Sequence, residues 1–219
     1  MLLKQIKYLI VKELSLELKQ KYALNSILLY VISTVFISYL SFKSVLQPSA
    51  WNALFWIIML FSSVNAINKS FLIENKRRHL YLYTLVSAQA IIISKIIYNI
   101  LLMMIISVIC LGFYMLFLGN LVQNMPLFFA VLLFGSAGFS SLLTMVSAIA
   151  SKTNNNFSMM AILSFPIMIP LLITIIKVSK NAVDGLSFSL SSSYLAVFFV
   201  RNLIVVLLSY LLFPYLWKD

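Results

Sequence analysis

Long apolar segments separated by short polar ones dominate the pattern of the chain. They lie at residues 24–42, 51–67, 90–118, 127–150, 157–176 and 194–217. An α-helix rises about 1.5 Å per residue, so about 20 apolar residues cross a hydrocarbon core of about 30 Å. The pattern therefore predicts an all-α protein with six transmembrane helices and with both termini on the same side of the membrane.

Residues 1–22 follow a different pattern, in which apolar residues recur at helical spacing among lysines. Leu2, Ile6, Leu9 and Ile10 share one face of a helix. This segment is predicted to be an amphipathic helix that lies on the cytosolic membrane surface with its apolar face down. It opens a single permease domain that spans residues 1–219.

Two acids interrupt the apolar face of this helix. Glu13 and Glu17 continue the face of Ile6 and Ile10 and lie one turn apart. An acid in such a position requires a basic partner or an aqueous pocket. Both acids can pair locally, Glu17 with Lys21 and Glu13 with a surface lysine, or they can face the basic cluster at residues 76–78.

Residues 68–87 are the one place between the first and last apolar segments where charges cluster. Since the segment joins the second and third predicted spans, it is expected to be a cytosolic loop or short helix on which a soluble motor can act. Contact with anionic membrane lipids is the alternative explanation for its basic residues. Its charged and histidine residues are Lys69, Glu74, Lys76, Arg77, Arg78 and His79.

The distribution of lysine and arginine orients the predicted spans. Most of these residues fall on one side, at positions 4, 7, 12, 19, 21, 69, 76, 77, 78, 95, 152 and 218. Because basic residues are retained in the cytosol, both termini are expected there, in a bacterial cytoplasmic membrane. Lys95 is expected to extend back to the cytosol, and Trp51 and Trp56 to form part of an outer interfacial belt.

The remaining basic residues fall on the outer side, Lys43 between the first two spans and the others near the last two. Residues 177–193 are predicted to form an outer loop that contains Lys177, Lys180 and Asp184. Arg201 follows inside the last span, where a cation is costly. It is expected either to extend to the outer surface or to meet Asp184.

Small residues gather within two turns of the fourth span, among them Gly135 and Gly138. Such residues let helix backbones approach closely. They predict a packing surface against another span or against a second copy of the chain.

The fifth span contains two prolines, Pro166 and Pro170, one helical turn apart. Each removes a backbone donor and clashes with the preceding turn. The pair predicts that residues 157–176 form a broken or re-entrant helix inside the bundle, with a role in gating.

Composition excludes several classes of protein. Hydrophobic residues make up 63% of the chain and charged residues 10%, too little polar surface for a soluble domain of this size. The net charge of +11 does not indicate nucleic-acid binding, because the basic residues flank apolar spans.

The sequence also lacks the residue patterns of common catalytic and cofactor sites. It has no glycine-rich phosphate loop, no His-Glu-x-x-His motif and no pair of acids within a span, and Cys110 is its one cysteine. The chain is therefore expected to be neither an enzyme nor a cofactor-binding protein, and to depend on a separate ATPase for energy.

These features together resemble the type-2 ABC exporter permeases, and more closely the CcmB family of the cytochrome c maturation system. The resemblance is most specific at residues 163–173, where Pro166 and Pro170 match the two prolines of the family signature. The segments 95–99 and 147–150 are also similar to the family. Where type-2 permeases carry an acid followed by a glycine-containing motif, this chain keeps the acid, Glu74, and lacks the glycine.

The resemblance implies a complex of two permease subunits with two copies of the ATPase CcmA, which binds the ATP. It also implies association with the haem-handling protein CcmC and the haem chaperone CcmE, so that haem belongs to the pathway without being bound by this chain. Residues 71–85 would form the helix that contacts the ATPase. Its contact residues would be Glu74, Lys76, Arg77 and Arg78, with Leu80, Tyr81 and Tyr83 as buried anchors.

Two other functions are compatible with the same architecture. The chain could be a type-2 permease that exports a lipid, a glycan or another substrate. It could also be a membrane scaffold that transports nothing and gathers partners.

Overall fold

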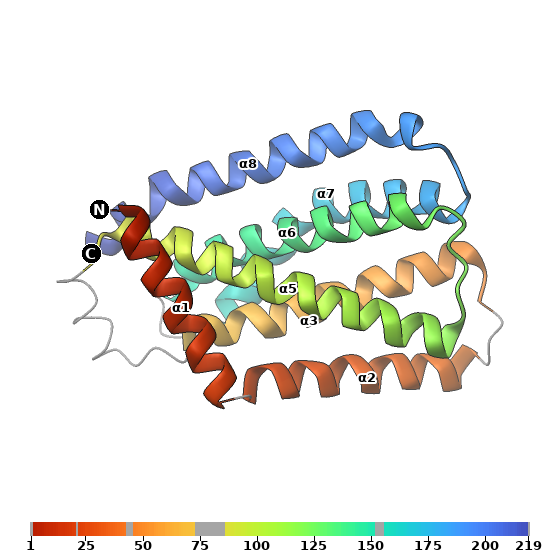
Figure 1. The fold of residues 1–219 in the computed structure, drawn as a ribbon, viewed down its shortest axis with the longest axis horizontal. Coiled ribbons are helices and arrows are strands. Elements are labelled where there is room, and N and C mark those ends of the chain that lie inside the picture. The colour runs from red at the N-terminus through yellow and green to blue at the C-terminus, as the bar shows by residue number, and fades with distance from the viewer. Residues whose placement is uncertain (1, 21, 43–45, 73–85, 152–155, 219) are drawn as a thin grey trace.

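The computed structural model describes residues 2–20, 22–42, 46–72, 86–151 and 156–218. Within these ranges the chain forms helices and no strand. The helices are α1 (Leu2–Gln20), α2 (Tyr22–Phe42), α3 (Pro48–Leu72), α5 (Ala88–Leu118), α6 (Met125–Ala150), α7 (Asn156–Val183) and α8 (Phe188–Lys218). Figure 1 shows α2 to α8 running along one axis, with α1 lying across them at the end that carries both termini.

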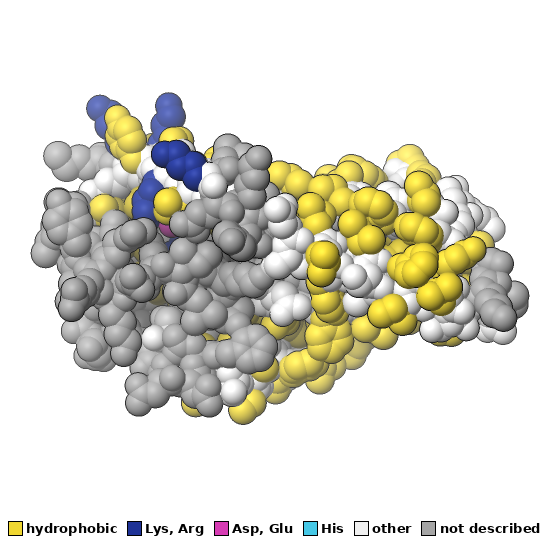
Figure 2. Space-filling view, turned by 90° about the horizontal axis from the view of Figure 1, so that it is seen from below, with side chains coloured by type: hydrophobic (Ala, Val, Ile, Leu, Met, Phe, Trp, Pro, Cys, Tyr) yellow, Lys and Arg dark blue, Asp and Glu magenta, His cyan; other side chains and the backbone are white. Residues whose placement is uncertain are grey.

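The prediction of six transmembrane helices is confirmed. Six helices, α2 to α8, are long and apolar enough to cross a membrane. Figure 2 shows hydrophobic side chains over much of one face of the bundle, while lysine and arginine gather at the end where α1 lies. The protein is therefore an all-α, multi-pass membrane protein.

The helices differ in how deeply they lie in the bundle. α6 packs against α3, α5, α7 and α8, and with α3 it forms the most buried part of the molecule. α2 and α8 lie at opposite edges (Figure 1) and expose most of their side chains. Because the exposed residues of α2, α7 and α8 are mainly large and apolar, these faces suit contact with lipid or with other membrane helices.

The prediction of an outer loop at residues 177–193 is wrong. α7 continues to Val183, and only residues 184–187 separate it from α8. Lys177 lies in the helix, with its Nζ atom 4.8 Å from the centre of the Tyr194 ring on α8. Lysines are compatible with this end of α7 because cations interact favourably with the C-terminus of a helix and with aromatic faces.

The break predicted at Pro166 and Pro170 is also wrong. Both prolines lie inside α7, which is one continuous helix. Each proline removes one N–H group, but the remaining backbone hydrogen bonds of a 28-residue helix are retained. The hydroxyl of Thr174 donates to the carbonyl oxygen of Pro170 at 2.9 Å. A role of these prolines in gating stays a prediction.

The two tryptophans lie in the core, so their assignment to an interfacial belt was wrong. Trp51 and Trp56 are fully buried. Trp51 Nε1 donates to the carbonyl oxygen of Gly119 at 3.1 Å, and Trp56 Nε1 donates to Ser179 Oγ at 2.8 Å. Because each indole N–H finds an acceptor inside the bundle, neither needs the polar membrane interface.

Candidate functional site

The end of the bundle that carries the termini is also the end where α3 leaves and α5 returns. Residues 73–85, which join these helices, lie outside the described residues. The predicted ATPase contacts Glu74, Lys76, Arg77, Arg78, Leu80, Tyr81 and Tyr83 all belong to that segment and stay predictions. The described residues next to it form the candidate site, a junction between α1, α5 and α6.

The apolar face of α1 packs against the start of α5. Ile6 and Leu9 are buried in a cluster with Ile91, Ile92 and Ile96 of α5. The prediction that this face rests on the membrane surface was therefore wrong, because α5 offers an apolar surface that buries it inside the protein. Leu3, Tyr8 and Val11 are the large apolar residues that α1 leaves most exposed.

Ser87 caps the N-terminus of α5 and also contacts α1. Its hydroxyl accepts a hydrogen bond from the backbone N–H of Ala90 at 3.4 Å, which stabilises the first turn of the helix. The same hydroxyl donates to Gln5 Oε1 at 3.2 Å. The first turn of α5 is thereby connected to α1, two residues after the segment that ends at residue 85.

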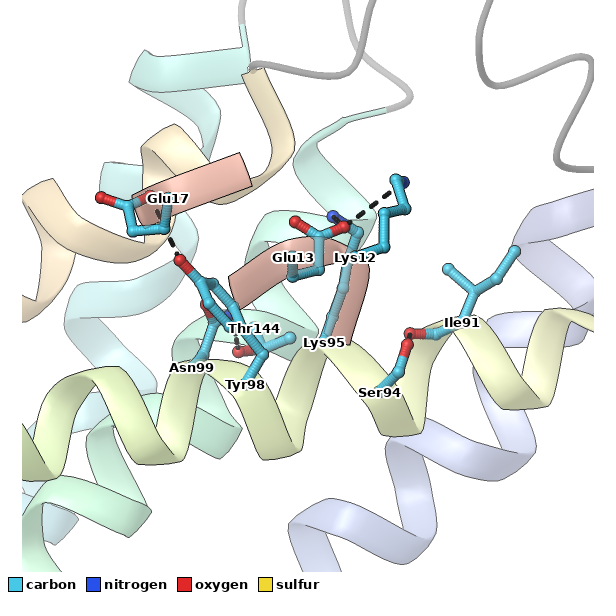
Figure 3. Close-up of polar contacts among 9 residues, drawn as sticks. All are labelled: Lys12, Glu13, Glu17, Ile91, Ser94, Lys95, Tyr98, Asn99 and Thr144. Atoms are coloured by element: carbon cyan, nitrogen blue, oxygen red, sulfur yellow. Dashed lines mark hydrogen bonds and ion pairs between the residues drawn. The ribbon is translucent and has the colours of Figure 1, made fainter. Parts of the chain in front are cut away.

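Glu13 and Lys95 form an ion pair between α1 and α5 (Figure 3). Lys95 Nζ lies 3.8 Å from Glu13 Oε1, and its side chain is only 2% exposed. The same carboxylate oxygen lies 3.5 Å from Lys12 Nζ, in agreement with the expected pairing to a surface lysine. The prediction that Lys95 extends to the cytosol was wrong, because the carboxylate of α1 meets it inside the protein.

A second acid of α1 binds the next turn of α5. The hydroxyl of Tyr98 donates to Glu17 Oε2 at 3.2 Å. Together with the Gln5–Ser87 and Glu13–Lys95 contacts, this bond connects α1 to the first three turns of α5. The pairing of Glu17 with Lys21 and the contact with residues 76–78 both involve positions outside the described residues.

The pairing of α1 with α5 was not predicted, although the sequence contained a signal for it. Two acids on an apolar helix face and a lysine within an apolar span each require an opposite charge or a polar partner. The sequence did not show that the acids of α1 and the lysine of α5 lie close together in space.

A buried hydrogen bond continues the junction from α5 to α6. Asn99 Nδ2 donates to Thr144 Oγ1 at 2.9 Å, and Thr144 donates in turn to the carbonyl oxygen of Ser140 at 2.6 Å. The side chains of Asn99 and Thr144 are fully buried. Displacement of α5 would therefore act on α1 through charges and on α6 through this bond.

The two predicted packing glycines lie between helices of one chain. A Cβ atom on Gly135 would come within 2.9 Å of the Trp56 ring on α3. One on Gly138 would come within 2.8 Å of Leu171 on α7 and 3.0 Å of Asn202 Oδ1 on α8. Both glycines therefore permit a close approach to α6. Contact with a second copy of the chain stays a prediction.

The junction is suited to transmit movement. An ion pair and side-chain hydrogen bonds join its three helices, as the contacts above show. Among the described residues, no group of three or more His, Cys, Asp or Glu could hold a metal ion.

Comparison with known proteins identifies one family for this arrangement. The family model described as CcmB protein matches residues 4–211, from the first turn of α1 to the last third of α8. A search of curated proteins finds no match.

Proposed function

Because this chain belongs to the CcmB family, whose members are ABC-transporter permeases of cytochrome c maturation, we propose that it couples ATP hydrolysis by CcmA to haem handling. In this proposal the ATPase cycle frees the haem-loaded chaperone CcmE from CcmC. The permease acts as a homodimer in the cytoplasmic membrane with both termini in the cytosol.

The contact between α1 and α5 supports this proposal most directly. α3 ends at Leu72 and α5 begins at Ala88, so force applied to the segment between them reaches both helices. The Glu13–Lys95 ion pair and the Tyr98–Glu17 hydrogen bond then require α1 to move with α5. The Asn99–Thr144 bond passes the displacement to α6, the central helix of the bundle.

Contact with the ATPase is assigned to residues 71–85. Lys76, Arg77 and Arg78 supply charge contacts next to Glu74, and Leu80, Tyr81 and Tyr83 supply buried anchors. Charges at an interface mainly orient the partner, while buried aromatic residues contribute most of the affinity.

Reversal of two charges in this segment tests the proposal. Arg77→Glu with Arg78→Glu is expected to reduce co-purification of CcmA at least tenfold and to abolish accumulation of holo-cytochrome c, because two attractive contacts become repulsive. Co-purified ATPase is measured by immunoblot and cytochrome c by haem staining.

Lys4→Glu with Lys7→Glu is the matched control, since it reverses two exposed lysines of α1 on the same side of the membrane. This control is expected to retain ATPase binding. Normal ATPase binding and cytochrome c maturation in the Arg77/Arg78 variant would show that the segment is not the coupling site. If deletion of the gene spares c-type cytochromes, the chain instead serves as an exporter of another substrate.

A further inference from the structure

Arg201 is a cation near the middle of a transmembrane helix. It follows Phe188, the first residue of α8, by 13 residues, which is about 20 Å of helix. Its Nη2 atom donates to the carbonyl oxygen of Ile167 on α7 at 3.5 Å. The predicted alternatives, the outer surface or Asp184, were therefore wrong, because the guanidinium is directed to the Ile167 carbonyl on α7 instead.

Lys95, the buried cation of α5, is neutralised by a carboxylate. Lys95 has Glu13 at 3.8 Å, whereas the contact found for Arg201 is a neutral carbonyl group. A backbone carbonyl can accept a hydrogen bond from an intramembrane arginine, but it does not neutralise the charge as an acid does. Arg201 therefore lacks the kind of partner that Lys95 has.

This chain cannot supply a carboxylate at the depth of Arg201. Its five acids lie in α1, in the segment 73–85, in the turn after α7 and at the C-terminus, and no acid lies within any of the six spans. The five acids are Glu13, Glu17, Glu74, Asp184 and Asp219. A second copy of the chain has the same spans, so it cannot supply the carboxylate either.

A lipid headgroup is also a poor match for Arg201. Headgroups lie at the membrane surface, about 15 Å from the middle of a 30 Å hydrocarbon core. The apolar stretch of α8 that is long enough to cross a membrane runs from Leu190 to Tyr215, and Arg201 lies near its centre. A phosphate at the surface is therefore too far away to act as its regular partner.

The surface around Arg201 is apolar and accessible from the side of the bundle. Ile167, whose carbonyl Arg201 contacts, and Val197, Val200 and Ile204, which lie within four residues of it on α8, are large and exposed. Such a surface fits a membrane helix, and the single cation within it selects a helix that carries an acid.

We propose that α7 and α8 form a docking surface for a transmembrane helix of a different membrane protein, and that Arg201 binds an Asp or Glu carboxylate in the middle of that helix. A permanent cation within a span favours a constitutive partner over a substrate that passes through, because the cation would otherwise lack its counter-charge between transport events. Arginine can also bind a carboxylate in a bidentate manner, which gives the contact a defined orientation. The inference does not depend on the proposed coupling to CcmA.

Crosslinking from the surface in intact cells tests this inference. A photoreactive benzoylphenylalanine at Ile204, one turn from Arg201, is expected to crosslink to a membrane protein other than this chain. Mass spectrometry should locate the adduct in a transmembrane helix that contains Asp or Glu.

Substitution of Arg201 should then remove the adduct. Arg201→Leu and Arg201→Gln are expected to reduce the crosslinked product at least tenfold, while Arg201→Lys retains part of it. The melting temperature of the purified chain in detergent should not fall in Arg201→Gln, which separates loss of the partner from loss of the fold. Lys177→Gln is the matched control, because it removes a cation near the outer end of α7 and should leave the adduct unchanged.

A charge exchange provides the decisive measurement. Arg201→Asp should abolish the adduct, and replacement of the partner's intramembrane acid by arginine should restore it in the Arg201→Asp background. The inference is overturned if the adduct is absent, forms with lipid or a second copy alone, lies in a helix without an acid, or persists in Arg201→Leu. If maturation is lost while the adduct persists, Arg201 instead binds an anionic substrate.

Discussion

At the scale of single residues, whether a charged side chain is buried in this protein depends on whether an opposite charge lies within reach. Lys95 is buried because Glu13 reaches it from α1, although the same carboxylate also contacts Lys12 at the surface. A buried charge that loses its counter-charge destabilises a protein more than an exposed one does. The contributions of Glu13 and Lys95 to the free energy of unfolding are therefore expected to depend on each other.

A double-mutant cycle measures this coupling. Glu13→Gln removes a carboxylate from Lys95 and is expected to cost about 3 kcal/mol of unfolding free energy. The double variant Glu13→Gln with Lys95→Met should be less destabilised than the sum of the single variants, by about 1–3 kcal/mol. Lys12→Met is the control and should change stability by less than about 0.5 kcal/mol. Additive effects, measured by denaturation in detergent micelles, would show that the pair does not interact.

At the scale of helices, α1 is attached to the first turns of α5. An apolar cluster, a capping serine, an ion pair and a tyrosine–carboxylate bond join the two helices along the length of α1. Because these contacts are distributed over about three turns of α5, relative sliding would break several at once. The two helices are therefore expected to move as one body during the ATPase cycle.

A covalent link between the helices tests this expectation. Gln5→Cys with Ser87→Cys, in a Cys110→Ala background, places two thiols at neighbouring positions of α1 and α5, whose side chains now meet through Gln5 Oε1 and Ser87 Oγ at 3.2 Å. Crosslinking with a short membrane-permeable bismaleimide is expected to leave cytochrome c maturation near the level of the single-cysteine controls. Loss of maturation in the linked protein alone would show that α1 must slide or detach from α5.

At the scale of the whole molecule, six spans place the two termini at the same end (Figure 1). The described basic residues of α1 lie at that end (Figure 2), as the predicted orientation with cytosolic termini requires. The turns between α5 and α6 and between α7 and α8 lie at the opposite end.

Reporter fusions check this orientation. Alkaline phosphatase, which is active only outside the cytosol, should be active when fused after Asn120 or Leu186 and inactive when fused after Lys218. A fluorescent protein that folds only in the cytosol should give the reverse pattern. High phosphatase activity from the C-terminal fusion would invert the topology and place residues 68–87 beyond the reach of an ATPase.

The sequence by itself determined the class of the protein, the number of its spans and its family. These properties follow from local hydropathy and from short motifs such as the proline pair at Pro166 and Pro170, and they do not depend on which helices are neighbours. The sequence did not determine the length of every helix, since α7 includes both prolines and continues through Lys177 and Lys180.

Only the tertiary structure decided where polar and aromatic side chains find their partners. It buried Trp51 and Trp56 in the core, brought Glu13 to Lys95 across 82 positions of the chain, and directed Arg201 to α7. The physical reason is that an apolar or charged surface can be satisfied by lipid, by water or by another helix. The choice among these depends on distances that emerge only when the helices pack together.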